Sequence, residues 1–96
     1  MTYYTRKQIL EVVETDDGFL TALEQEEILV GDAPYGSAGE FSERMLERVR
    51  VAQNLVRDLE VNMAGAAVIV RMREEMADLR RYVEELLAEV RRRTGS

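Results

Sequence analysis

The residues of this sequence that could do acid–base chemistry are carboxylates, because the chain of 96 residues has neither histidine nor cysteine. Imidazole catalysis, disulfides and thiolate metal sites are therefore excluded, which leaves carboxylates, arginines, Lys7 and hydroxyls. Two pairs of adjacent glutamates, Glu74 with Glu75 and Glu84 with Glu85, have the composition of a general acid and base. Adjacent side chains on a helix point about 100° apart, so these pairs are poorly placed to act on one substrate. We interpret both pairs as solvated helix surface, and expect no enzyme activity, no cofactor and no metal.

The charge of the chain is distributed unevenly along the sequence, although the whole carries a formal net charge of −6. Residues 1–40 contain two basic and nine acidic residues, a net charge of −7, whereas residues 41–96 contain eleven basic and ten acidic residues, a net charge of +1. Lysine and arginine supply most non-specific affinity for DNA, so a duplex should repel the first part of the chain. An acidic surface that only maintains solubility is the simpler alternative.

Start and stop signals divide the N-terminal part of the chain into two short helices and a loop. Thr5 and Gln8 have the spacing of a capping box, which predicts a first helix over residues 6–13. Asp16 is a favourable N-cap for a second helix. The apolar residues of this second helix fall on one face: Phe19, Leu20 and Leu23. Residues 28–41 contain the only proline and three of the six glycines, which predicts a loop or a small hairpin.

A third helix should begin at Ser42, and a much longer fourth helix should follow Asn62. The third helix is expected to direct seven apolar residues inward: Met45, Leu46, Val49, Ala52, Leu55, Val56 and Leu59. Asn62 is a favourable N-cap, and no proline follows it, so about 30 residues should form one helix about 45 Å long. A helix of this length extends beyond its own domain.

The long helix carries an unbroken heptad pattern of apolar residues, which we call the seam. Its members alternate between spacings of three and four residues: Ile69, Met72, Met76, Leu79, Val83, Leu86 and Val90. With Ile69 at position a, Arg73 and Arg80 lie at e, and Glu75 and Glu89 lie at g.

The two parts of the seam have different interpretations. We interpret Ile69 and Met72, and by extension Met76, as part of the domain core. No apolar element remains in the chain to cover the later members, which favours a homodimer formed through Leu79, Val83, Leu86 and Val90. Packing of these residues against the N-terminal domain of a partner is the alternative. A parallel pair would use the charges at e and g better than an antiparallel pair, but the sequence leaves the direction open.

The order of these elements resembles the MerR family of transcription regulators. Two helices, a hairpin-like wing, a helix that opens with Phe-Ser-Glu and a long coiled helix follow one another in the same order. Three segments are more specifically similar to the chaperone-modulator family typified by CbpM: "YYTRKQILEVV", "LEQEEIL" and "DLEVNMAGAAVIVRMREEM". The resemblance implies a mainly α fold, with a MerR-like winged helix-turn-helix and a small hairpin wing over residues 1–62, a long C-terminal coiled-coil helix over residues 63–93, and a tail over residues 94–96.

The second helix departs from the MerR pattern at the positions that reach DNA. When the sequences are aligned on Ile28 and Leu29, the positions of the MerR proline and DNA-contacting arginines are occupied by Asp17, Gly18 and Thr21. Glu27 stands where relatives commonly have a glycine that ends the helix in a left-handed turn. We therefore do not expect this helix to bind DNA.

The resemblance implies a protein partner instead. Proteins of the CbpM family bind the J-domain of a DnaJ- or CbpA-type co-chaperone and inhibit it by competing with its docking on Hsp70. A J-domain presents a basic helix, so an acidic surface would gain association rate and charge complementarity. The residues expected to bind it lie on the outward side of the second helix: Asp17, Thr21, Glu24, Gln25 and Glu27.

Two further expectations complete this interpretation. The alternative function is that of a MerR-type, HspR-like DNA-binding transcription regulator, in which the wing or other helices contact DNA. The N-terminal residues include no apolar run of the length that a signal sequence or membrane span needs, so we expect a cytoplasmic protein.

Overall fold

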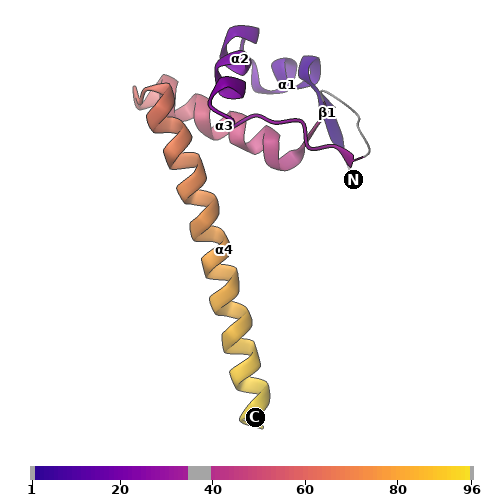
Figure 1. The fold of residues 1–96 in the computed structure, drawn as a ribbon, viewed down its shortest axis with the longest axis vertical. Helices are drawn as coiled ribbons and strands as arrows, with labels where there is room; N and C mark the ends of the chain where they lie inside the picture. Colours follow the sequence, from indigo (N-terminus) through magenta and orange to yellow (C-terminus); the bar gives the residue numbers. More distant parts are fainter. Residues whose placement is uncertain (1, 35–39, 96) are drawn as a thin grey trace.

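The computed structural model describes residues 2–34 and 40–95, which form four helices and one two-stranded sheet. The elements follow the order β1 (Tyr3–Thr5), α1 (Arg6–Val13), α2 (Asp17–Gln25), β2 (Glu40–Ser42), α3 (Glu43–Asp58) and α4 (Met63–Arg93). Figure 1 shows a head formed by the sheet and the first three helices, from which α4 projects as a long arm. The prediction of a mainly helical fold with a small sheet and a long C-terminal helix is confirmed.

A capping side chain at each N-terminus explains where the helices begin. The side chains of Thr5, Asp16, Ser42 and Asn62 each accept a hydrogen bond from the backbone N–H three residues later. At α1 the capping box is complete, because Gln8 Oε1 also accepts from the Thr5 N–H at 2.8 Å. Each cap satisfies an amide that has no partner inside the helix and stabilises it by about 1 kcal/mol. These short-range interactions are the reason that the helix starts were predictable.

Three glutamates with left-handed backbone lie where the first three helices end: Glu14 (φ 58°), Glu27 (φ 58°) and Glu60 (φ 55°). At the end of α2, this conformation allows the N–H groups of Ile28 and Leu29 both to donate to the Leu23 carbonyl, at 2.9 and 3.2 Å. A residue in the left-handed region commonly ends a helix in this way, and glycine adopts it with least strain. The turn expected of glycine is therefore retained here with glutamate at position 27.

The loop between α2 and α3 is closed at its base by Asp32. The Asp32 N–H donates to the Glu40 carbonyl at 3.2 Å, and its carboxylate accepts from the Ser42 N–H at 2.7 Å. The other side of β2 pairs in antiparallel register with β1, which places Tyr4 opposite Phe41. The tip of the predicted wing, residues 35–39, lies outside the described residues. The pairing of β2 with the N-terminal strand joins distant segments and was not predicted.

The core of the head is built around α3, which contacts α1, both strands and α4. Four of the seven α3 residues expected to point inward are buried, namely Met45, Leu46, Val49 and Ala52, and Leu55 and Val56 are partly buried. The prediction for Leu59 was wrong, since its side chain is 68% exposed. α3 ends at Asp58, and the backbone of Leu59 is no longer α-helical. The helical periodicity therefore does not place the Leu59 side chain on the inward face.

The face by which α4 packs on the head differs from the seam. The buried residues of α4 are Ala66, Ala67 and Val70, whose small side chains allow α3 and α4 to approach closely. The expectation that Met72 and Met76 belong to the core was wrong, because they are 54% and 59% exposed. Ile69 lies between the two faces and is partly buried.

The later members of the seam are exposed within the single chain. Leu79, Val83, Leu86 and Val90 have exposed fractions of 62%, 46%, 48% and 56%. Residues 79–90 belong to the part of α4 that projects from the head in Figure 1. The chain itself therefore leaves these four side chains uncovered.

Replacing Glu27 by glycine should stabilise the fold. A left-handed conformation strains a residue that has a Cβ atom, and glycine removes this strain at a smaller cost in backbone entropy. We expect Glu27→Gly to raise the free energy of unfolding by about 0.5–1 kcal/mol in urea titrations at one fixed protein concentration. Glu26→Gly is the matched control, because Glu26 has φ of −85°, and it should give no stabilisation. Equal effects of the two changes would contradict this explanation of the turn.

Candidate functional site

The outward surface of α2 is organised by one arginine from the start of α1. Arg6 Nε donates to Asp17 Oδ1 at 2.6 Å, Nη1 donates to Glu24 Oε1 at 2.5 Å, and Nη2 donates to Thr21 Oγ1 at 2.9 Å. These residues are spaced four and three apart, so they lie on one face of α2 and meet around a single guanidinium. Its hydrogen bonds to Asp17 and then to Glu24 raise the pKa of Arg6. We call Arg6, Asp17, Thr21 and Glu24 the Arg6 cluster.

The structure brings together three of the five residues predicted to bind a partner. Asp17, Thr21 and Glu24 belong to the Arg6 cluster and are exposed, as predicted. Gln25 and Glu27 are also exposed, but lie outside the cluster, at and beyond the C-terminal end of α2. The predicted residues therefore form two groups on the exposed side of α2. Arg6 holds three of them together, and the other two lie at the C-terminal end of the helix.

The surface remains acidic even when its arginines are counted. Residues 16–27 contain five acidic and no basic residues. Besides Arg6, Arg71 of α4 reaches this helix and donates from Nη2 to the Glu26 carbonyl at 2.6 Å. This contact places a cation at the C-terminal end of α2, where the helix dipole favours positive charge. Five carboxylates against two guanidinium groups leave a local charge of −3.

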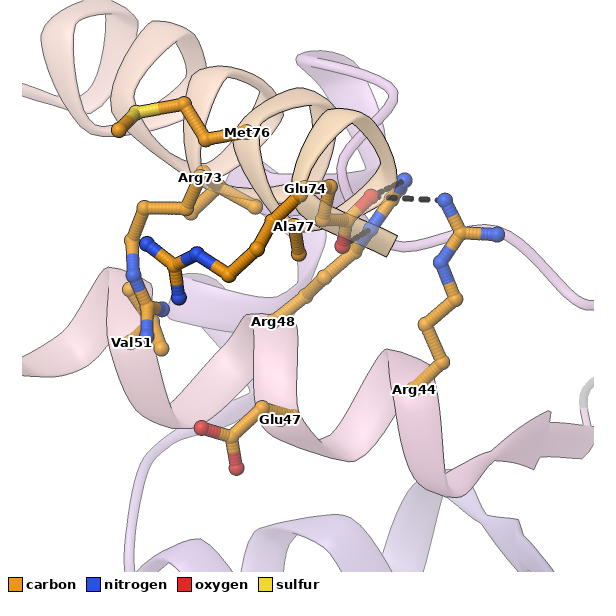
Figure 2. Close-up of a pocket in the computed structure, with 10 residues that line it drawn as sticks. Arg44, Glu47, Arg48, Val51, Arg73, Glu74, Met76 and Ala77 are labelled. Carbon is orange, nitrogen blue, oxygen red and sulfur yellow. Dashed lines mark hydrogen bonds and ion pairs between the residues drawn. The ribbon is translucent and has the colours of Figure 1, made fainter. Parts of the chain in front are cut away.

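A second arrangement of charged residues lies between α3 and α4. Arg48 of α3 donates from Nε and Nη2 to both oxygens of Glu74 of α4, at 2.8 and 2.7 Å, and from Nη1 to the Ile28 carbonyl at 2.9 Å. Arg44 adds a bond from Nη2 to Glu74 Oε1 at 2.7 Å, so two arginines converge on one carboxylate, as Figure 2 shows. The Arg48 side chain is only 13% exposed and that of Glu74 25%. This paired geometry is the strongest that arginine forms with a carboxylate.

The charge of Glu74 is held by these arginines. The hydrogen bonds from Arg48 and then from Arg44 lower the pKa of Glu74 from 4.5 to about 2, despite the opposing effect of partial burial. Glu74 is thus a fixed anion, and its neighbour Glu75 is exposed on another side of α4. The interpretation of Glu74 as solvated helix surface was wrong, because its side chain is partly buried and ion-paired with two arginines of α3.

A groove of about 450 Å³ opens beside the paired charges of α3 and α4. Its walls carry four arginines and two glutamates: Arg44, Arg48, Arg73, Arg80, Glu47 and Glu74. Its apolar surface comes from Val51, Val70, Met76 and Ala77. The sequence interpretation missed both this groove and the role of Arg6. The four-residue spacing of Arg44 and Arg48 indicated a basic stripe on α3, but nothing local indicated that it faces Glu74.

Two structural findings concern metals and membranes. Within residues 2–34 and 40–95, no group of three or more acidic side chains is close enough to hold a metal ion. No helix in the described part of the chain has the combined length and apolar character that crossing a bilayer requires.

The sequence of this chain matches one known protein family. A family model described as "MerR HTH family regulatory protein" matches residues 4–87, which include all four helices up to the last turns of α4. The chain belongs to this MerR family. The match includes the helix-turn-helix formed by α1 and α2 together with most of the long helix. Comparisons with curated proteins and with solved structures gave no match.

The ion pairs of Glu74 should make stability depend on pH in a defined range. The pKa of Glu74 is lower in the folded than in the unfolded protein, so its contribution is complete above about pH 4.5 and is lost as the pH falls toward 2. Glu74→Gln should lower the free energy of unfolding at pH 7 by up to about 3 kcal/mol and flatten its pH dependence in that range.

Urea titrations from pH 7 to pH 2.5 measure this effect. Glu75→Gln is the matched control, because it removes the adjacent charge on an exposed side of the same helix. A pH dependence as steep in Glu74→Gln as in the unmutated protein would contradict the prediction.

Proposed function

We propose that this protein is a binding protein that modulates a DnaJ- or CbpA-type co-chaperone by occupying its J-domain. The observation that supports the proposal best is the acidic outward face of α2. In a helix-turn-helix this second helix is the element that enters the DNA groove, where cations are needed. Here it offers carboxylates, and the nearest arginine is engaged by two of them. Such a face is suited to a basic protein surface.

The Arg6 cluster favours binding in two ways. The five acidic residues of 16–27 provide the field that attracts a basic helix and increases the association rate. Arg6 also holds Asp17 and Glu24 in defined positions, so less side-chain entropy is lost when a partner binds. The partner's lysines or arginines would then compete with Arg6 for the two carboxylates.

Charge reversal on α2 tests the proposal. Asp17→Lys/Glu24→Lys should slow the association with the J-domain of the organism's own co-chaperone by about tenfold or more at low salt, because steering is lost. Binding by the unmutated protein should weaken as salt rises, since exposed charges are screened over about 10 Å at 0.1 M. Association rates are measured by stopped-flow fluorescence, and circular dichroism checks that helicity is equal.

Glu84→Lys/Glu85→Lys is the matched control for this experiment. It changes the net charge equally, at exposed positions of α4 away from the head. Its association rate should fall far less than that of the α2 variant. Equal rates for the α2 variant and the unmutated protein would overturn the proposed binding face.

The second candidate function, DNA-binding regulation, is favoured by membership of the MerR family. The local charge of −3 at α2 argues against it, because lysine and arginine supply most non-specific affinity for the phosphate backbone and an acidic surface repels it. Fluorescence anisotropy with duplexes from the promoter regions near the gene distinguishes the two functions. Sequence-selective nanomolar binding at physiological salt would favour the regulator over the co-chaperone modulator.

We also propose that the exposed later seam forms a homodimer. Four apolar side chains at heptad spacing, each about half exposed, are suited to a second copy of the same helix. Leu86→Glu places a charge in this seam and should dissociate the dimer at micromolar concentration, because burial of an unpaired charge costs several kcal/mol. Ala88→Glu, at an exposed position two residues away, should leave it intact. Sedimentation equilibrium provides the measurement, and a monomeric unmutated protein would contradict the proposal.

A further inference from the structure

The groove between α3 and α4 has a charge opposite to that of the protein around it. Its four arginines and two glutamates give a local charge of +2, whereas the chain as a whole carries −6. We propose that this groove binds a small organic anion, with a carboxylate, phosphate or sulfonate group on an apolar body. This site is separate from the α2 face and does not depend on the proposed function.

Within the single chain, the cations available for such an anion are Arg73 and Arg80. Glu74 is already bound by Arg48 and Arg44, so these three side chains are engaged with one another and carry a net charge of +1. Among residues 2–34 and 40–95, no hydrogen bond or ion pair joins the guanidinium of Arg73 or Arg80 to another residue. The two arginines are seven residues apart on α4, which places them on the same side of the helix about 10 Å apart. Arginine binds carboxylate and phosphate oxygens through two parallel N–H donors.

The apolar part of the groove sets the second requirement for the ligand. Val51 and Val70 line it from α3 and α4, together with Met76 and Ala77. Figure 2 shows the Arg73 side chain extending from α4 across the groove toward Val51 on α3, so that charge and apolar surface lie side by side. The volume of about 450 Å³ lies within the range of small-molecule sites, about 300–1,000 Å³. A ligand with both an anionic group and an apolar body matches this lining.

The surrounding charge explains why the anion should be small. A nucleic acid or an extended acidic protein would also approach the N-terminal part of the chain, whose net charge of −7 repels it. A small anion can enter the groove without meeting that surface.

The test uses the full chain with 1-anilinonaphthalene-8-sulfonate, a fluorescent anion with an apolar body. The unmutated protein should bind it, and Arg73→Gln/Arg80→Gln should weaken the affinity by about tenfold or more, because charge-assisted bonds are lost. Arg50→Gln/Arg91→Gln is the control, since both arginines are exposed and neither lines the groove. N-phenyl-1-naphthylamine, which lacks the sulfonate, should bind the unmutated and Arg73/Arg80 variants alike. Two results would overturn the proposal. One is equal affinity of the Arg73/Arg80 variant and the Arg50/Arg91 control for the sulfonate, and the other is equal affinity of the unmutated protein for the two dyes.

A second measurement needs no substitution and locates the probe. In protein labelled at the methionine methyl groups, the sulfonate should shift the NMR signal of Met76, which lines the groove, much more than that of Met72. Met72 is a suitable comparison because it is exposed on the same helix outside the groove lining. Decanoate should displace the dye, as an organic carboxylate of the proposed class. Equal shifts of both methyl groups would place the probe on the exposed seam and overturn the proposal.

Discussion

The arrangement of the molecule depends on Arg48 and the carboxylate of Glu74. Arg48 comes from the helix at the centre of the core, and its three hydrogen bonds join α3 to α4 and to the turn after α2. Apolar packing through Ala66, Ala67 and Val70 brings α4 onto the head by a face of small side chains. A two-oxygen ion pair accepts one geometry, so it specifies the rotation as well as the contact.

The rotation of α4 decides which surfaces the protein presents. With Glu74 turned toward α3, Met72 and the later seam face outward, and Arg73 and Arg80 line the groove. The proposed dimer and the proposed anion site therefore both depend on one partly buried ion pair. Loss of Glu74 would alter them together, even though neither uses its carboxylate.

The molecule carries one acidic and one basic region. The α2 face is acidic and ordered by Arg6, whereas the groove between α3 and α4 is basic and surrounds a neutralised glutamate. In a MerR helix-turn-helix protein, this distribution is the reverse of what DNA recognition by α2 requires. The proposed function uses this acidic helix for contact with a protein, whereas the four arginines of the groove lie on α3 and α4.

The sequence by itself determined the local features of this protein. The caps at Thr5, Asp16, Ser42 and Asn62 act over three residues, so the helix starts could be predicted from neighbouring residues alone. The acidic character of α2 is likewise a property of composition, and burial did not alter it.

Only the tertiary structure decided which long-range partners meet. Arg6 is 11 residues from Asp17, Arg48 is 26 from Glu74, and Tyr4 pairs with Phe41. The heptad pattern could not show that Met72 and Met76 face solvent. An apolar stripe predicts which face of a helix is suited to packing, but not which other element packs against it. The Arg48–Glu74 pair and the small alanines of α4 made that choice, through contacts between residues that no local pattern connects.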